Sequence, residues 1–333
     1  MATAAGCDAG LAKRQTPAQP ARTLEQRPLN ELQFVGSHNS YKLAIEPEIM
    51  AQLVDASPRI AGSMEYWHEP LARQLELGLR VLELDLFYDP TRQLFDRDSA
   101  FPVLHVQTID SASSCATLEI CFEQILAWTA ANPQHEPIMI SFNAKDSRID
   151  RPGFVVPEPF TEHAFRELDG LLQQIVGARL LLPGDIERSG AGDTWLQWPT
   201  LGAARGKFLL LLDESGRKRE QYLAANPVPV MFANLPATDH RAAIMVLNDP
   251  TRQAAEICAR SAEGYLVRTR ADANTVEARM NATQRRDAAF ASGAQFVSTD
   301  YYLPATHFGN DYQVVLPGGG AVRRNPASAC AAR

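Results

Sequence analysis

The chain has 333 residues, of which 45% are hydrophobic and 21% are charged, and its formal net charge is −7. This is ordinary globular composition, and the acidic balance without any basic run excludes a typical nucleic-acid-binding protein. No apolar run reaches the roughly eighteen residues that a transmembrane helix requires, so we expect a soluble or peripherally membrane-associated protein.

Residues 1–28 are rich in Ala, Pro, Gln and Thr with little periodicity, which predicts an extended or disordered lead-in. Within it, Ala4-Ala5-Gly6-Cys7 is similar to the end of a bacterial lipoprotein cleavage box. We therefore expect a secreted or cell-envelope protein, in which Cys7 is either lipidated or an ordinary free or disulfide-bonded cysteine.

From residue 29 onward, strand and helix patterns alternate. Strands are predicted at eight places, namely 29–36, 79–87, 102–106, 137–143, 206–213, 228–234, 264–270 and 294–300. Helical spacing of apolar residues predicts helices at 71–79, 117–131, 160–175, 251–260 and 275–292. Eight strands with helices between most of them predict an α/β fold, a single-domain TIM-type (β/α)₈ barrel.

We place the barrel domain at residues 29–312 and expect it to be a monomer, with a mobile segment between the first strand and Pro70 and a coil at 313–333. Of the five cysteines, Cys115 and Cys121 bracket a short loop, which predicts a local disulfide in an oxidising compartment. The sequence leaves the pairing of the other three open.

Two carboxylates interrupt the apolar strand predicted at 79–87. Because side chains alternate between the two faces of a strand, Glu83 and Asp85 point the same way, and their charges must be compensated. One interpretation is a pair of structural ion pairs with arginines on neighbouring strands. The other is a divalent metal site, for which oxygen ligands favour Ca²⁺ or Mg²⁺ over zinc.

Further polar residues gather at the carboxyl ends of the predicted strands, where barrel enzymes place their active sites. These are His38, Asn39, His105, Asn143, Lys145, Asp213, Arg268, Arg270 and Asp300. Each alone is often a structural residue, but together they form a set suited to phosphodiester cleavage. Two histidines supply a base and an acid, and cations neutralise charge on phosphorus.

These motifs resemble the bacterial Ca²⁺-dependent phosphoinositide phospholipases C. The resemblance covers nearly the whole chain from residue 29 and rests on several motifs, chiefly Ser37-His38-Asn39-Ser40, Leu82-Glu83-Leu84-Asp85, Val103-Leu104-His105-Val106, Tyr265-Leu266-Val267-Arg268-Thr269-Arg270 and Ser298-Thr299-Asp300-Tyr301. It implies a barrel enzyme that cuts phosphatidylinositol at a membrane surface into diacylglycerol and a cyclic inositol phosphate.

The resemblance also implies roles for individual residues. Catalysis would fall to His38 and His105, with His105 as the general acid and either His38 or a metal-bound carboxylate as the base. Ca²⁺ would be bound by Asn39, Glu83, Asp85 and Asn143, and the substrate by Lys145, Arg268, Arg270 and Asp300.

One residue departs from the pattern of the family. Asn143 stands where relatives usually carry a glutamate ligand, so the site has one negative charge fewer. We therefore expect a weak Ca²⁺ requirement, or a different substrate class.

Two rival functions share these residues. A glycerophosphodiester phosphodiesterase or a sphingomyelinase-D-like enzyme would use the same barrel, histidines and carboxylates. An inactive lipid- or carbohydrate-binding barrel would be expected to have lost one of them, and none is missing. Exposed aromatic residues for a membrane surface are sought in Met64-Glu65-Tyr66-Trp67 and Tyr301-Tyr302-Leu303. Trp67 fits a packed core position equally well, and either aromatic group is also suited to stacking on the inositol ring.

Overall fold

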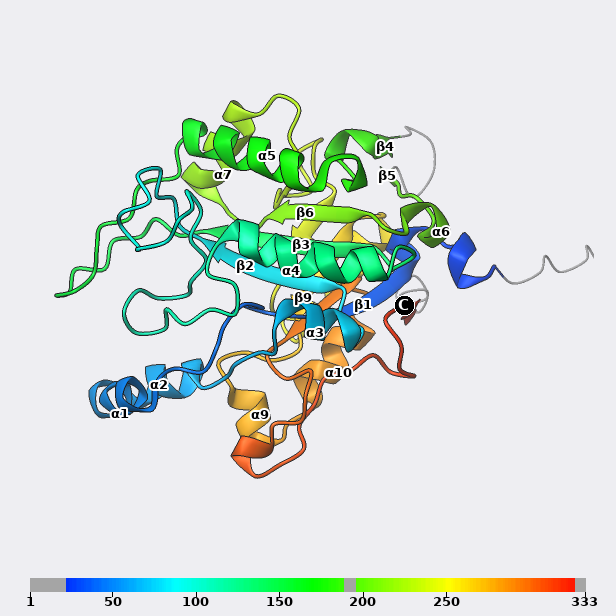
Figure 1. The fold of residues 1–333 in the computed structure, drawn as a ribbon. Helices are drawn as coiled ribbons and strands as arrows, with labels where there is room; N and C mark the ends of the chain where they lie inside the picture. The colour runs from blue at the N-terminus through cyan, green and yellow to red at the C-terminus, as the bar shows by residue number, and fades with distance from the viewer. Residues whose placement is uncertain (1–21, 189–195, 327–333) are drawn as a thin grey trace, which may run out of the picture.

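The computed structural model describes residues 22–188 and 196–326 (Figure 1). Its strands are β1 (Leu32–Ser37), β2 (Val81–Leu86), β3 (Ile138–Ala144), β4 (Glu187–Arg188), β5 (Leu196–Gln197), β6 (Phe208–Leu212), β7 (Phe232–Ala233), β8 (Ile244–Val246), β9 (Leu266–Arg270), β10 (Phe296–Thr299) and β11 (Arg323–Arg324). Its α-helices are α1 (Pro47–Ala56), α2 (Pro58–Met64), α3 (Leu71–Glu76), α4 (Leu118–Ala131), α5 (Glu162–Val176), α6 (Leu201–Ala204), α7 (Gly216–Ala225), α8 (Ala254–Ala262), α9 (Val276–Met280) and α10 (Gln284–Ala291).

Eight parallel strands form the barrel in the order β7-β6-β3-β2-β1-β10-β9-β8. The two end strands pack side by side, and Val246 N donates to Asn234 Oδ1 across the gap at 3.2 Å. The barrel is thus nearly closed, which confirms the predicted TIM-type fold.

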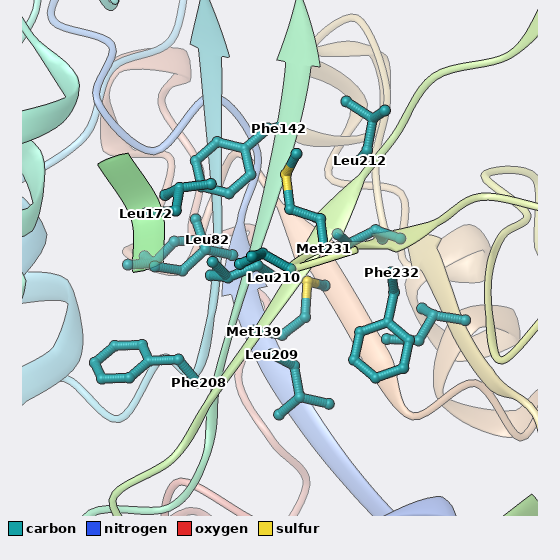
Figure 2. Close-up of a cluster of buried hydrophobic side chains, with 14 of the residues drawn as sticks. Leu82, Met139, Phe142, Leu172, Phe208, Leu209, Leu210, Leu212, Met231 and Phe232 are labelled. Atoms are coloured by element: carbon teal, nitrogen blue, oxygen red, sulfur yellow. The ribbon is translucent and has the colours of Figure 1, made fainter. Parts of the chain in front are cut away.

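Apolar side chains fill the space between the strands and the helices outside them. The outward faces of β2 and β3 present Leu82 and Phe142 to helix α5, where Leu172 is completely buried. Figure 2 shows these three side chains within one hydrophobic cluster. In Figure 1, α4 and α5 lie over the strands β2, β3 and β6. This packing fixes the strands whose inner faces carry the polar residues.

Gly36 allows β1 to approach β2 unusually closely. A Cβ at this position would lie 2.0 Å from the carbonyl oxygen of Val81, so no other residue fits without moving the strand. Gly36 and Val81 are partners in the parallel register. The close approach brings the residues that follow β1, His38 and Asn39, next to the carboxylates of β2.

The predicted third strand at 102–106 is wrong. In the connection between β2 and α4, these residues make only isolated antiparallel bridges, of Pro102 with Thr117, Val103 with Leu86 at the end of β2, and Val106 with Asp110. Their apolar character reflects burial of a loop, since Val103 is fully buried. The eighth barrel strand is instead β8, whose three residues are too short for a clear alternation.

Other predicted boundaries also change. The segment before Pro70 is not mobile coil but carries α1 and α2, each starting at a proline that suits the first helical position. The helix predicted at 275–292 is two helices, α9 and α10, because Asn281 turns left-handed at φ 49°. The tail after Tyr312 includes β11, which pairs antiparallel with β1.

The predicted disulfide between Cys115 and Cys121 is confirmed, with a sulfur–sulfur distance of 2.06 Å. Cys258 is disulfide-bonded as well, whereas Cys7 and most of the predicted lead-in lie outside the described residues. Within residues 22–188 and 196–326, no helix has the length and apolar character needed to cross a membrane.

Candidate active site

A cavity of about 480 Å³ opens at the carboxyl ends of the barrel strands. Nine of the ten residues predicted for catalysis, metal and substrate binding line it, namely His38, Asn39, Glu83, Asp85, His105, Asn143, Lys145, Arg268 and Arg270. The tenth, Asp300, lies behind His38. Parallel strands end on the same side of the barrel, so residues that are far apart in the sequence share this one cavity.

His38 is held between an acid and an arginine. Its Nδ1 is 2.9 Å from Asp300 Oδ1, and its Nε2 is 3.1 Å from Arg270 Nη1. Arg270 also donates through Nη2 to Asp300 Oδ2 at 2.8 Å. Because a guanidinium only donates, Nε2 must accept, and the ring proton sits on Nδ1 facing Asp300. In this tautomer the Nε2 lone pair faces Arg270, and Glu83 Oε1 lies 3.6 Å from the same nitrogen.

Asp300 is completely buried within this cluster. Burial raises the pKa of its carboxyl, but His38 and Arg270 lower it by more, so it stays ionised. The neighbouring Asp272 accepts a hydrogen bond from Asp300 N at 2.9 Å. Burial, with a contribution from the Asp300 charge, raises the pKa of Asp272 to about 7. The two acids thus divide into Asp300, which is ionised, and Asp272, which takes up a proton much more readily.

His105 has a carboxylate partner of its own. Its Nδ1 is 2.7 Å from Asp110 Oδ2, and the second oxygen of Asp110 lies 3.2 Å from Lys42 Nζ. Both Asp110 and Lys42 are completely buried. The site therefore contains two histidines, each oriented through Nδ1 by an aspartate, on different loops of the barrel mouth.

Between the histidines, Asn143 bridges the two carboxylates of β2. Its Nδ2 donates to Glu83 Oε1 at 3.0 Å and to Asp85 Oδ1 at 3.1 Å. The register pairs Asp85 directly with Asn143, which brings the amide to this position. A neutral amide thus contacts both acids at the floor of the cavity.

Each of these carboxylates also meets a cation. Arg268 Nη2 donates to Glu83 Oε2, and Lys145 Nζ lies 3.1 Å from Asp85 Oδ2. Burial raises the pKa of Asp85, but Lys145 and the two histidines lower it below its usual value. Compensation by an arginine on another strand and by a lysine is the ion-pair arrangement that the sequence left open.

The oxygen donors of the cavity suit a hard cation, but only two of the four proposed ligands are negatively charged. Two carboxylates and the carboxamides of Asn39 and Asn143 are of the type that Ca²⁺ takes, once the Asn143 amide rotates to present its oxygen. Among the described residues, no group of three or more His, Cys, Asp or Glu side chains is suited to hold a metal. The donors thus fit Ca²⁺ in type, while Lys145 and Arg268 already contact the same two carboxylates.

Sequence reasoning did not place several residues that support this site. His68 Nε2 donates to the His38 carbonyl at 2.7 Å, and burial lowers the pKa of His68 to about 4, so it is neutral. The Tyr66 hydroxyl accepts from Asn39 Nδ2 at 2.7 Å. Asp213 lines the cavity, and burial raises its pKa to about 6. The sequence had placed Asp213 among the polar residues at strand ends and Tyr66 in a loop proposed for membrane or inositol contacts, but it had given neither residue its supporting role.

The sequence matches the family described as phosphoinositide phospholipase C, Ca²⁺-dependent, over residues 28–100 and 91–326. These ranges contain every residue of the site. The chain belongs to this family. It is accordingly an enzyme of the phosphoinositide phospholipase C class, a phosphodiesterase, as the motifs predicted.

Solved structures share the fold of this phospholipase C family member. A calcium-dependent phosphoinositol-specific phospholipase C from Pseudomonas sp, in its apo form as a myo-inositol complex, is 16% identical with a TM-score of 0.55, over 93% of this chain and 100% of that chain. A Ca²⁺-dependent phosphatidylinositol-specific phospholipase C from Streptomyces antibioticus is 20% identical with a TM-score of 0.51, over 83% and 95%. No curated protein sequence matches significantly.

Proposed function

We propose that this chain cleaves the phosphodiester of phosphatidylinositol to diacylglycerol and a cyclic inositol phosphate, with His38 as general base and His105 as general acid. The observation that carries the proposal is the pair of aspartate-oriented histidines on one cavity that also holds Lys145, Arg268 and Arg270. Phosphodiester cleavage needs two proton transfers and positive charge around phosphorus, and these residues supply both.

The base step follows from the hydrogen bonds of His38. Its Nε2 accepts a hydrogen bond from Arg270, so the lone pair is available when a substrate hydroxyl takes the place of that arginine. The inositol hydroxyl next to the phosphate gives its proton to Nε2 and forms a bond to phosphorus. Asp300 stabilises the resulting imidazolium through Nδ1, and Arg270 becomes free to donate to a phosphate oxygen.

The acid step uses the second histidine. As the bond from phosphorus to the glycerol oxygen breaks, protonated His105 gives its proton to that oxygen and releases diacylglycerol. Asp110 keeps the ring oriented through Nδ1 during the transfer. Water can then open the cyclic phosphate with the same two groups in exchanged roles.

The family is described as Ca²⁺-dependent, and we propose that this chain binds Ca²⁺ weakly. Asn39, Glu83, Asp85 and Asn143 would hold it, and when bound it would lower the pKa of the attacking hydroxyl. Lys145 and Arg268 already bring positive charge to the same carboxylates. We therefore propose a millimolar requirement.

The decisive experiment is phosphorus NMR of the products from phosphatidylinositol vesicles, with Ca²⁺ and with chelator, for the wild type and His105→Ala. The proposal requires a cyclic inositol phosphate signal that the substitution abolishes. Cleavage of a soluble glycerophosphodiester with the lipid untouched would instead establish a glycerophosphodiester phosphodiesterase. Headgroup release from sphingomyelin would indicate a sphingomyelinase-D-like enzyme. If none of these substrates is turned over, the chain is an inactive binding barrel.

We further propose that the enzyme approaches the membrane as a peripheral, secreted or cell-envelope monomer. Trp67 and Leu303 are exposed and line one shallow hollow, which also reaches Asp300 behind His38. The other aromatic residues expected there, Tyr66, Tyr301 and Tyr302, are buried, and Tyr301 and Tyr302 line the same hollow. Two exposed apolar side chains beside the cavity suit partial insertion between lipids.

A further inference from the structure

Lys42 is a completely buried lysine that none of the steps above uses. Its ammonium lies 3.2 Å from Asp110 Oδ1, and neither side chain has any solvent exposure. An unpaired charge buried in this way would cost several kcal/mol, so the two groups depend on each other. The same carboxylate holds His105 through its other oxygen, Oδ2, at 2.7 Å. Asp110 is thus shared between a lysine and the histidine proposed as general acid.

The position of the ammonium is fixed by backbone groups. Lys42 Nζ donates to the carbonyl of Tyr66 at 2.8 Å and to the carbonyl of Leu43 at 3.1 Å, and it lies 4.7 Å from the centre of the Tyr66 ring. The ammonium therefore cannot move away from Asp110 without breaking these two hydrogen bonds. The charge that Asp110 experiences is built into the fold.

Other charged and titratable groups surround this chain of contacts. Burial lowers the pKa of Lys42, and Asp110 and then Asp300 raise it in part. His68, Tyr66 and the buried Tyr41, which lies within electrostatic range of Asp110, are further titratable groups around the ammonium. Asp85 also interacts electrostatically with His105. Of these, only Asp110 contacts both Lys42 and His105.

We propose that Lys42 is a positioning residue that sets how firmly Asp110 holds the proton of His105. The inference rests on the proposed function, in which His105 must give up a proton. A carboxylate without a counter-charge stabilises the imidazolium strongly, whereas one neutralised by an ammonium orients the ring and holds its proton less firmly. With Lys42 present, Asp110 orients the His105 ring, and the imidazolium remains acidic enough to give up its proton.

A purely structural role predicts something different. If Lys42 only ties the loop after β1 to Tyr66 and Asp110, its loss lowers stability and leaves the protonation of His105 unchanged. The two roles are separated by Lys42→Gln, which keeps donors for the two carbonyls but removes the charge, and by Lys42→Arg, which keeps the charge. Lys207, which donates to the Ala178 carbonyl away from the cavity, offers the control Lys207→Gln.

The experiment follows the ring nitrogens of His105 by NMR during a pH titration, together with the alkaline limb of kcat/KM. We expect both to move upward by about one pH unit in Lys42→Gln, to return close to the wild type in Lys42→Arg, and not to move in Lys207→Gln. A folded Lys42→Gln with a wild-type titration would overturn the inference. The NMR titration needs no substrate, so it decides the matter even where phosphatidylinositol is not cleaved.

A second variant covers the case in which Lys42→Gln does not fold. Asp110→Asn removes the carboxylate between the two groups, so the double variant Asp110→Asn/Lys42→Gln buries no unpaired charge. In the Asp110→Asn background, the Lys42 substitution should no longer move the His105 titration. A shift of about one pH unit between Asp110→Asn and the double variant would mean that Lys42 acts on His105 by another route, which contradicts the proposal.

Discussion

Asn143 Nδ2 donates to Glu83 Oε1 over 3.0 Å, so a neutral amide stands beside a carboxylate at the floor of the cavity. The same amide reaches Asp85, and both acids have a cation on their other oxygen. Glu83, Asp85, Lys145 and Arg268 thus form two ion pairs, so a divalent ion must compete with two cations for these carboxylates.

Asn143→Glu should therefore strengthen Ca²⁺ binding. The substitution adds a negative charge and two oxygen donors where the amide now donates, so we expect roughly a tenfold lower dissociation constant. Isothermal titration calorimetry measures it directly. Asn248→Asp adds a charge on the opposite side of Arg268 and should have a smaller effect. Submicromolar affinity in the wild type would show that Lys145 and Arg268 do not weaken the site.

Substrates with different leaving groups should separate the roles of the two histidines. Both His38→Ala and His105→Ala should lose about 10²- to 10⁴-fold in kcat on phosphatidylinositol. With an aryl phosphodiester, whose leaving group needs no proton, only the loss in His105→Ala should shrink. The exposed His163, which pairs with Glu167 on α5, gives the control His163→Ala. An equal recovery of both variants would contradict the assignment of base and acid.

A buried acid far from the cavity should make stability depend on pH. Asp169 on α5 accepts from Val230 N and Tyr222 OH, both at 3.2 Å, and burial raises its pKa to about 7. Because this pKa lies above the unfolded value, the native state binds the proton more tightly. The contribution of Asp169 to stability is therefore full below about pH 4 and is lost as the pH rises toward 7.

Asp169→Asn cannot titrate, so it should remove this part of the pH dependence. Between pH 4.5 and 7.5 the wild type should lose about 1 to 3 kcal/mol more of its unfolding free energy than the variant does, measured by urea denaturation. Asp213 and Asp272 act in the same direction in both proteins and cancel in the comparison. The exposed Asp150→Asn should keep the wild-type slope. Equal slopes for Asp169→Asn and the wild type would refute the assignment.

Trp67 should matter only at a lipid surface. The residue is 46% exposed, and its ring centre lies 4.5 Å from that of His307, so Trp67→Ala should fold normally. We expect roughly tenfold lower activity on phosphatidylinositol vesicles and little change on a short-chain monomeric substrate. Val228, which is 79% exposed and precedes β7 at the other end of the barrel, gives the control Val228→Ala. Equal losses on both substrates would mean that Trp67 acts on the site itself.

The sequence alone determined that the two histidines, the two carboxylates of β2 and the main cations would meet in one cavity. Alternation along β2 puts Glu83 and Asp85 on one face, and parallel strands bring their carboxyl ends to one side. These rules depend on the local sequence or on the fold class, so they can be applied without knowing any tertiary contact. The same reasoning misplaced a strand at 102–106, because an apolar buried loop and a short strand look alike in sequence.

Only the tertiary structure decided how those residues are paired. Asp110 faces His105 and Lys42, and Asn143 donates to both acids of β2, because of loop geometry and strand register. The close approach at Gly36 sets the distance between β1 and β2 in the same way. A hydrogen bond depends on distances of a few tenths of an ångström, and residue type and spacing do not carry that information.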